Sequence, residues 1–198
     1  MRWNRVIGIS AAAAAAIAAV LVASCANQGG TGASAPLTQE QKVARGSKLV
    51  WAGGCVDCHT PGTFYGAPDT TRMLSGTELG WTGPWGTTYP RNLTPDSTGI
   101  VAWSEDQIVA TIKTGHRPDG SALLPPMPWQ AYSYGFSDED LHNIAAYLKS
   151  LPPIHHVNPQ RVPPGGQGTL PALVFPPPPA WDAQNLPPPP AAGSTTTP

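Results

Sequence analysis

The sequence predicts a small all-α domain, flanked by an N-terminal export segment and a proline-rich C-terminal segment. Three stretches carry apolar residues at helical spacing, each behind a residue that can cap a helix. No stretch shows the alternation of apolar and polar residues that is typical of a half-buried strand. The chain has 198 residues, of which 25 are Pro and 21 are Gly, and most of the prolines lie beyond Leu151. The packed part is therefore short enough to be one domain.

We expect the three helices over residues 38–50, 104–114 and 137–150. Each begins with a hydroxyl side chain that can accept a hydrogen bond from the backbone of the first turn: Thr38, Ser104 and Ser137. Glycines end the first two helices, and prolines end the third. Residues 60–103 are rich in Gly, Pro and Thr without a sustained period. A loop of this length in a compact domain usually wraps another group.

The N-terminal residues 1–24 have the parts of an export signal. Two arginines precede an apolar, Ala-rich stretch over residues 6–22, which is shorter than the about 20 strongly apolar residues of a membrane-spanning helix. The ending, Leu-Val-Ala-Ser-Cys, resembles a bacterial lipoprotein signal, and this resemblance implies that Cys25 is the lipidated first residue of the mature chain. Ordinary cleavage nearby, with Cys25 left as a free thiol, is the alternative. Residues 25–37 then form a flexible linker.

The last segment, residues 154–198, carries two runs of four prolines. Because such a segment lacks backbone donors and apolar side chains, we expect it to be an extended or disordered spacer outside a domain of residues 38–153. The alternative is a docking strand for a partner, with Phe175 and Trp181 as anchors.

The charge of the chain excludes one class of function. The 11 basic and 12 acidic side chains are nearly balanced and make up only 12% of the residues. No basic stripe is present, so we expect no binding of nucleic acid.

The chemistry of the chain centres on the sequence Cys-Val-Asp-Cys-His at residues 55–59. This spacing is the attachment signature of c-type haem. Cys55 and Cys58 can add to the two vinyl groups of one porphyrin, and His59 then presents its imidazole to the iron. Covalent attachment takes place in exported chains, which agrees with the N-terminal signal. We therefore predict one covalently bound haem c.

Three other interpretations of this motif remain. Cys55 and Cys58 could form a disulfide, but the loop between them would be short and strained. A thioredoxin-like motif would need a preceding strand and a following helix, which the sequence does not predict. A zinc site could combine the two cysteines with His155 and His156, but these histidines lie about a hundred residues away, in the Pro-rich segment.

The iron of such a haem takes a sixth ligand or keeps an open face. Met127 lies among three prolines, which would present its thioether to one place, and His/Met ligation raises the reduction potential. Met73 and, for bis-histidine ligation, His116 are the alternatives. We expect His142 to lie on a helix surface.

Several further motifs resemble one family. They are Asn-Leu-Thr-Pro-Asp at residues 92–96, Arg-Pro-Asp-Gly at 117–120, Leu-Pro-Pro-Met-Pro at 124–128, and Ser-Asp-Glu-Asp-Leu at 137–141. Together they resemble the class I cytochrome c domains in the cytochrome subunits of bacterial membrane-bound alcohol and gluconate dehydrogenases. The resemblance covers about residues 38–153. Many such subunits carry two or three attachment motifs, whereas this chain has one, which favours a single-haem protein.

The resemblance implies roles for individual residues. Cys55 and Cys58 are the thioether cysteines, His59 is the proximal ligand and Met127 the distal one. In class I domains the first and last helices cross at a glycine and an aromatic residue, which here correspond to Gly46 and Tyr147.

Two expectations concern the surroundings of the haem. The second ring nitrogen of His59 should donate to a backbone carbonyl, for which we expect one just before Pro61 or Pro68. The haem propionates need hydrogen-bond donors, and the candidates, each of which could equally be a packing or surface residue, are Trp81, Trp85, Arg91 and Arg117.

The sequence thus predicts an electron-transfer protein rather than an enzyme. We expect a monohaem cytochrome c in the bacterial periplasm or cell envelope, tethered to the membrane through its N-terminal lipid. It would carry single electrons from a dehydrogenase or quinol-oxidising complex to a terminal oxidase or another acceptor. The alternatives are a dedicated cytochrome subunit of one dehydrogenase, and a haem enzyme or gas sensor with an open sixth position.

Overall fold

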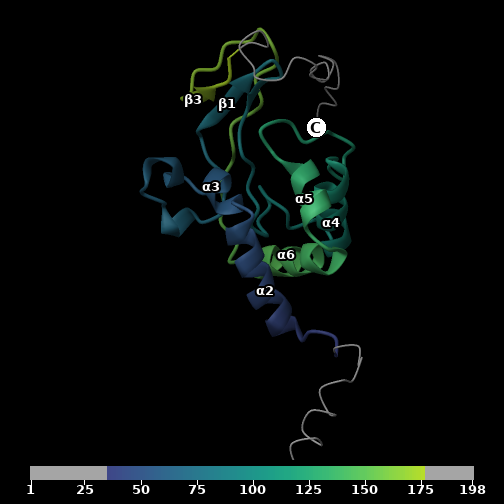
Figure 1. The fold of residues 1–198 in the computed structure, drawn as a ribbon. Helices are drawn as coiled ribbons and strands as arrows, with labels where there is room; N and C mark the ends of the chain where they lie inside the picture. Colours follow the sequence, from purple (N-terminus) through teal and green to yellow (C-terminus); the bar gives the residue numbers. More distant parts are fainter. Residues whose placement is uncertain (1–34, 177–198) are drawn as a thin grey trace, which may run out of the picture. The chain divides into compact units, whose positions relative to one another are not determined.

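The computed structural model describes residues 35–176, and every structural statement below concerns that part of the chain. All of its helices and strands belong to the compact unit that begins at Leu37 (Figure 1). The predicted signal peptide and the lipidated Cys25 lie outside the described residues, as does most of the predicted linker. No helix within the described range is long and apolar enough to cross a membrane.

The three predicted helices are present as α2 (Gln39–Ala52), α4 (Glu105–Thr114) and α6 (Asp138–Ser150). Each begins with a reciprocal capping box, in which the hydroxyl and the third helical side chain each accept from the other residue's backbone N–H. Two short helices that the sequence did not predict complete the set: α3 (Cys55–His59) and α5 (Trp129–Gly135). Single 3-10 turns, η1 (Thr63–Tyr65) and η2 (Thr70–Arg72), lie in the long loop after α3.

Helices α2 and α6 cross in close contact. A Cβ atom built on Gly46 would overlap the backbone carbonyl of Asn143 and lie 2.8 Å from the Cβ of Tyr147. Only glycine permits this approach, so the crossing of the first and last helices at Gly46 and Tyr147 is confirmed.

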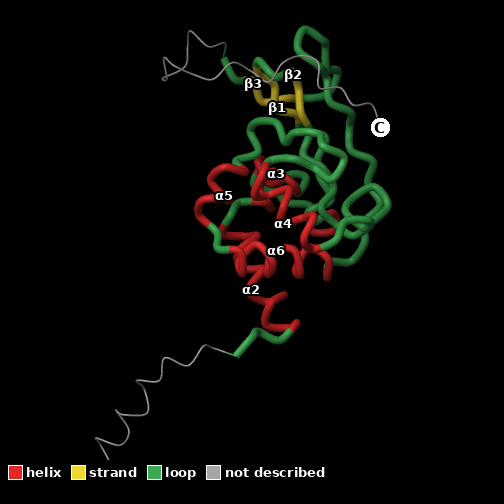
Figure 2. The backbone as a smooth tube through the Cα atoms, turned by 90° about the vertical axis from the view of Figure 1, so that its right-hand side faces the viewer, coloured by secondary structure: helices red, strands yellow, loops and turns green. Residues whose placement is uncertain are grey.

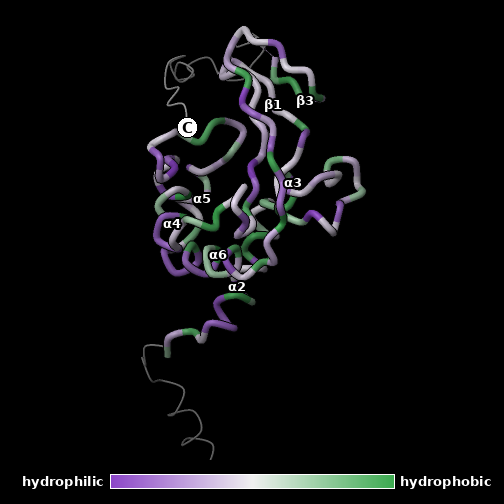
Figure 3. The backbone as a smooth tube through the Cα atoms, turned by 180° about the vertical axis from the view of Figure 1, so that it is seen from behind, coloured by the Kyte–Doolittle hydropathy of each residue, from purple (hydrophilic) through white to green (hydrophobic). Residues whose placement is uncertain are grey.

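The apolar core lies between these helices and the loop after α3. Figure 3 shows hydrophobic and hydrophilic positions mixed along α4 and α6, as expected of helices with one buried face. The buried apolar side chains of this cluster come from α2, α3, α4, α6 and the loop between α3 and α4: Val50, Val56, Leu74, Ile100, Ile108, Val109, Leu141, Ile144, Ala145 and Leu148.

The structure contains a small sheet, so the all-α expectation is corrected. Its strands are β1 (Gly80–Gly83), β2 (Gly86–Thr88) and β3 (Ala172–Val174), in the order β2-β1-β3. Strand β1 pairs antiparallel with β2 and parallel with β3, and Figure 2 shows the three together, away from α2 and α6. Strands of three or four residues are too short to show an alternating pattern, and Gly and Thr dominate two of them.

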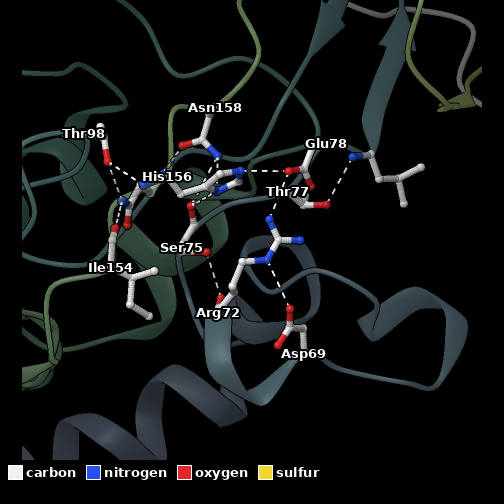
Figure 4. Close-up of polar contacts among 11 residues, drawn as sticks. Asp69, Arg72, Ser75, Thr77, Glu78, Thr98, Ile154, His156 and Asn158 are labelled. Carbon is white, nitrogen blue, oxygen red and sulfur yellow. Dashed lines mark hydrogen bonds and ion pairs between the residues drawn. The ribbon is translucent and has the colours of Figure 1, made fainter.

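The first part of the Pro-rich segment lies against the domain, rather than forming the expected spacer. His156 and Asn158 contact the loop around Ser75 (Figure 4), Val162 pairs with Thr87, and β3 follows. Buried polar side chains hold this segment, since Asn158 is only 5% exposed. An apolar pattern therefore does not reveal the contact. Residues 177–198, which include Trp181, lie outside the described range.

Candidate haem site

Helix α3 carries the attachment motif as a single helical turn. Gly54, which precedes it, has a φ of 68°, in the left-handed region where a side chain is disfavoured. This conformation lets α3 start directly after α2. The hydroxyl of Tyr132, in α5, donates a 2.6 Å hydrogen bond to the carbonyl of Gly53. Helix α5 is thereby fixed beside the start of the attachment motif.

His59 is oriented by a backbone carbonyl. Its side chain is buried, and Nδ1 lies 2.7 Å from the carbonyl oxygen of Arg91. A carbonyl only accepts, so Nδ1 carries the proton and Nε2 keeps its lone pair. Burial lowers the pKa of His59, which favours this neutral form. The imidazole is thus prepared as a metal ligand through Nε2.

The expected partner of His59 was therefore of the right kind but at the wrong position. The acceptor lies at Arg91, not just before Pro61 or Pro68, because the loop after α3 runs out through the β1–β2 hairpin and returns. The return is fixed by hydrogen bonds from the backbone N–H of Gly76 to the His59 carbonyl, at 2.8 Å, and from that of Leu74 to the Thr60 hydroxyl, at 3.0 Å.

Cys55 and Cys58 are both free thiols. Burial raises the pKa of Cys55 to about 11 and also raises that of Cys58. The two side chains are therefore neutral at ordinary pH, whereas zinc ligation and thiol exchange require thiolates. The arrangement does not favour a thioredoxin-like motif, and no disulfide joins the pair.

His155 and His156 have partners other than the cysteines. His155 Nδ1 lies 3.2 Å from a carboxylate oxygen of Asp96. His156 places Nδ1 2.8 Å from the carbonyl of Ser75 and Nε2 2.9 Å from Glu78, as Figure 4 shows. Within residues 35–176 no group of three or more His, Cys, Asp and Glu side chains is arranged to hold a metal ion. The two histidines fasten the C-terminal segment instead.

The two candidate methionines differ in their surroundings. The sulfur of Met73 accepts a hydrogen bond of 3.6 Å from the hydroxyl of Thr60, directly after His59. Met73 also packs against the apolar core. Met127 follows a cis Pro125–Pro126 peptide bond and is half-buried, outside that cluster.

The backbone around Met127 is held from three sides. Its N–H donates to the carbonyl of Leu124 at 3.2 Å, and its own carbonyl accepts from Trp129 at 3.0 Å. The hydroxyl of Thr88, in β2, donates to the carbonyl of Pro125 at 3.0 Å. The loop is thus fixed to both the sheet and α5.

His116, the remaining ligand alternative, and His142 both lie at the surface. His116 is exposed, and its Nδ1 lies 2.9 Å from the carbonyl of Thr114. His142 lies on the outer side of α6, where the carbonyl of Asp138 and then the carboxylate of Asp106 raise its pKa. The surface position expected for His142 is confirmed.

The predicted propionate donors fall into two groups. Arg117 is half-buried and donates to the hydroxyl of Ser121 and the carbonyl of Ala122, each at 3.1 Å. Burial lowers the pKa of Arg117, and the charge of Arg91 lowers it further. Arg117 in turn contributes to the lowered pKa of His59. The charge of Arg117 is therefore felt at His59, whose ring is bonded to the backbone of Arg91.

The two tryptophans belong to the hairpin. Trp85 is buried, and its Nε1–H donates to the carbonyl of Trp81 at 3.3 Å. Trp81 meets Phe64 edge to face, with ring centroids 5.1 Å apart, and Phe175 of the C-terminal segment lies 6.1 Å from it. Their indoles thus build an aromatic cluster over β1.

Comparison with known families decides the identity of the domain. The family model for cytochrome c matches residues 43–152, which is more than half of the chain. The chain belongs to the cytochrome c family. The match includes the attachment motif, the Arg91 carbonyl and Met127.

Similar proteins include longer cytochromes. This cytochrome c is 32% identical over 117 residues to a diheme cytochrome c-type protein of Cereibacter sphaeroides, covering 57% of this chain and 37% of that one. It is 35% identical to the gluconate 2-dehydrogenase cytochrome c subunit of Pantoea cypripedii, over 59% of this chain and 25% of that one. It is 39% identical to the cytochrome c subunit of a quinone alcohol dehydrogenase of Gluconobacter oxydans, over 58% and 25%. The chain thus spans between a quarter and somewhat more than a third of the length of these relatives.

One charged residue near the hairpin was not found by sequence reasoning. Arg161 donates from Nη2 to the carbonyl of Trp85 at 2.9 Å, and its buried Nε has no hydrogen-bond partner among the described residues. It lies in the Pro-rich segment, where the composition indicates a spacer. No local signal in the sequence could have shown that this segment lies against the hairpin.

The described residues fit a covalently bound haem. Two neutral thiols lie one turn apart, and His59 beside them is held in the tautomer that ligates through Nε2. The orphaned Nε of Arg161 suits a group that carries carboxylates.

Proposed function

We propose that this cytochrome c is a monohaem electron carrier of the bacterial periplasm or cell envelope. It takes single electrons from a membrane-associated dehydrogenase or quinol-oxidising complex and passes them to a terminal oxidase or another acceptor. The observation that carries the proposal is the single attachment motif on α3, whose His59 is already oriented by the Arg91 carbonyl. The family membership and the named relatives support it.

Each residue of the site has one task in this proposal. Cys55 and Cys58 would hold the haem through thioether bonds, and His59 and Met127 would ligate its iron. The bound haem supplies a one-electron ferric/ferrous couple. The hydrogen bond to the Arg91 carbonyl would hold the His59 ring in place, and the contacts of Thr88 and Trp129 would limit the movement of the Met127 loop. Little rearrangement is then needed when the electron arrives or leaves.

A partner would dock where aromatic side chains surround the attachment motif. Phe64 and Tyr65 are 48% and 72% exposed. Together with Cys58 and Trp81 they line a small surface hollow. Exposed aromatic surface beside the thioether, with Asp57 at the same hollow, would let a partner approach the haem edge through a small contact, which suits a weak, short-lived complex.

Visible spectroscopy of the purified holoprotein tests this function. We expect one haem per chain, and a His/Met spectrum that does not change when cyanide or nitric oxide is added. Met127→Ala should lose that spectrum and bind cyanide, whereas the matched variant Met73→Ala should keep it. A wild-type protein that binds these ligands readily would instead indicate a haem enzyme or gas sensor. An unchanged spectrum in Met127→Ala would remove Met127 from the iron.

The names of the relatives favour a second candidate, a dedicated cytochrome subunit of one dehydrogenase. Truncation after residue 176 distinguishes the two, because it removes the final prolines and leaves β3 in place. If a dehydrogenase copurifies with the full chain and is lost on truncation, the subunit candidate is supported. Electron transfer that is unaffected by the truncation favours the mobile carrier.

We also propose that Cys25 carries the lipid that tethers the protein. The support is the lipoprotein-like sequence at residues 21–25, and several acyl chains would hold the protein stably on a membrane. Cys25→Ser should move the haem protein from the membrane fraction to the soluble fraction after cell lysis. Retention in membranes would point to a different anchor.

A further inference from the structure

The arginines of residues 35–176 divide into two groups. Arg45 pairs with Asp140, and Arg72 pairs with Asp69 and Glu78. Within the same range Arg91, Arg117 and Arg161 form no ion pair. Among these three, Arg161 lies in the C-terminal segment, for which the sequence predicted a spacer.

The side chain of Arg161 lacks hydrogen-bond acceptors among the described residues for most of its donors. Only one of its five N–H donors has a partner in the described structure, the carbonyl of Trp85 at 2.9 Å. Its Nε is fully buried and unpaired. The residue as a whole is half-buried, but leaving a buried N–H of a charged group without an acceptor is costly. An anion that binds here would remove this cost.

The pairing of Val162 with Thr87 shows which part of the domain Arg161 faces, and therefore which group could supply the anion. Thr87 and Val162 form an antiparallel pair, in which each N–H donates to the other's carbonyl, at 2.8 and 2.9 Å. Thr88 and Arg161 are therefore opposite one another and project to the other face of the pair. On that face the Thr88 hydroxyl reaches the carbonyl of Pro125, two residues before Met127. Arg161 thus lies on the face that meets the Met127 loop.

We propose that Arg161 binds a haem carboxylate and that residues 154–176 are part of the haem site. The inference rests on the proposed function, because it assumes that the domain holds a covalent haem. A planar guanidinium can bind a carboxylate through two parallel hydrogen bonds. Its positive charge stabilises the ferrous state, which carries one positive charge fewer than the ferric state, and so raises the reduction potential.

The test compares the reduction potentials of holoproteins. At a fixed ambient potential, Arg161→Gln should lower the ratio of ferrous to ferric protein by about threefold to tenfold, where tenfold corresponds to about 59 mV for a one-electron couple. Arg45→Gln is the matched control, because it removes the same charge from an exposed ion pair on α2, and its ratio should change less than about twofold. An Arg161→Gln protein with the wild-type potential would overturn the proposal.

A second variant keeps the proposal testable if Arg161→Gln yields no holoprotein. Arg161→Lys keeps the charge but loses the bidentate geometry, so its potential should stay near that of the wild type. The propionate-bending band in its resonance Raman spectrum should shift, and a band identical to that of the wild type would count against the contact. A failure of the proposed function has a different signature, because it appears in the wild type as missing haem or a missing His/Met spectrum.

Discussion

The imidazole Nδ1 of His59 donates a 2.7 Å hydrogen bond to the backbone carbonyl of Arg91, 32 residues further along the chain. This contact links α3 to the end of the hairpin loop. It depends on the backbone of Arg91 and not on its side chain. The loop as a whole, with its hydrogen bonds from Gly76 and Leu74, therefore sets the position of the proximal ligand.

The helix crossing gives the first prediction. Gly46→Ala should lower the free energy of unfolding by about 1–3 kcal/mol, because its methyl group would overlap the carbonyl of Asn143 and force α2 and α6 apart. Gly135→Ala is the control, since a Cβ there meets no atom within 4 Å. Urea unfolding of the holoproteins measures both. Equal stability of the two variants would mean that the crossing can relax.

The fastening of the C-terminal segment gives the second prediction. The side chain of Asn158 accepts from the backbone N–H of Asn92 at 2.6 Å and donates to the carbonyl of Ser75 at 3.3 Å. Asn158→Ala leaves these buried groups unpaired and should cost about 1–3 kcal/mol. It should also make residues 154–176 more sensitive to limited proteolysis. The exposed Gln160→Ala should do neither, and a protease-resistant Asn158→Ala would show that β3 alone holds the segment.

The contact between α5 and the attachment motif gives the third prediction. Tyr132→Phe removes one hydrogen bond to the carbonyl of Gly53 and should lower stability by about 0.5–1.5 kcal/mol. Tyr134→Phe removes the same hydroxyl from a side chain that is 95% exposed and should have no effect. Chemical denaturation followed at the haem absorption measures both. No difference between the variants would indicate that a water molecule replaces the lost donor.

The dependence of folding stability on pH in the acid range gives the fourth prediction. Hydrogen bonds from the backbone N–H and then the hydroxyl of Thr98 lower the pKa of Asp96 from 3.8 to about 2. A lowered pKa stabilises the folded state above pH 3.8, and this contribution disappears as the pH falls toward 2. The melting temperature of the wild type should therefore be higher than that of Asp96→Asn at pH 6. The difference between the two melting temperatures should disappear by about pH 2. Glu139→Gln, at an exposed position on α6, should show no such convergence.

Local patterns in the sequence predicted local structure well. The three capping boxes at Thr38, Ser104 and Ser137 involve residues three apart, and the spacing of Cys55, Cys58 and His59 concerns one turn. The sequence predicted a backbone acceptor for His59 but not its position at Arg91. That position depends on the path of a long loop, which no local pattern shows. Arg161 and β3 were missed because backbone pairing and the side chain of Asn158 hold their segment, and neither leaves a hydrophobic period.

Strand β3 has a consequence for where the domain ends. The family match stops at residue 152, yet β3 pairs with β1 at Ala172–Val174, and the N–H of Phe175 donates to the carbonyl of Thr82 at 2.8 Å. A protein cut at the family boundary would leave one side of β1 with unsatisfied N–H and C=O groups. An open strand edge of this kind recruits other chains and promotes aggregation. The C-terminal segment thus covers an edge of β1 that a protein cut at residue 152 would expose to other chains.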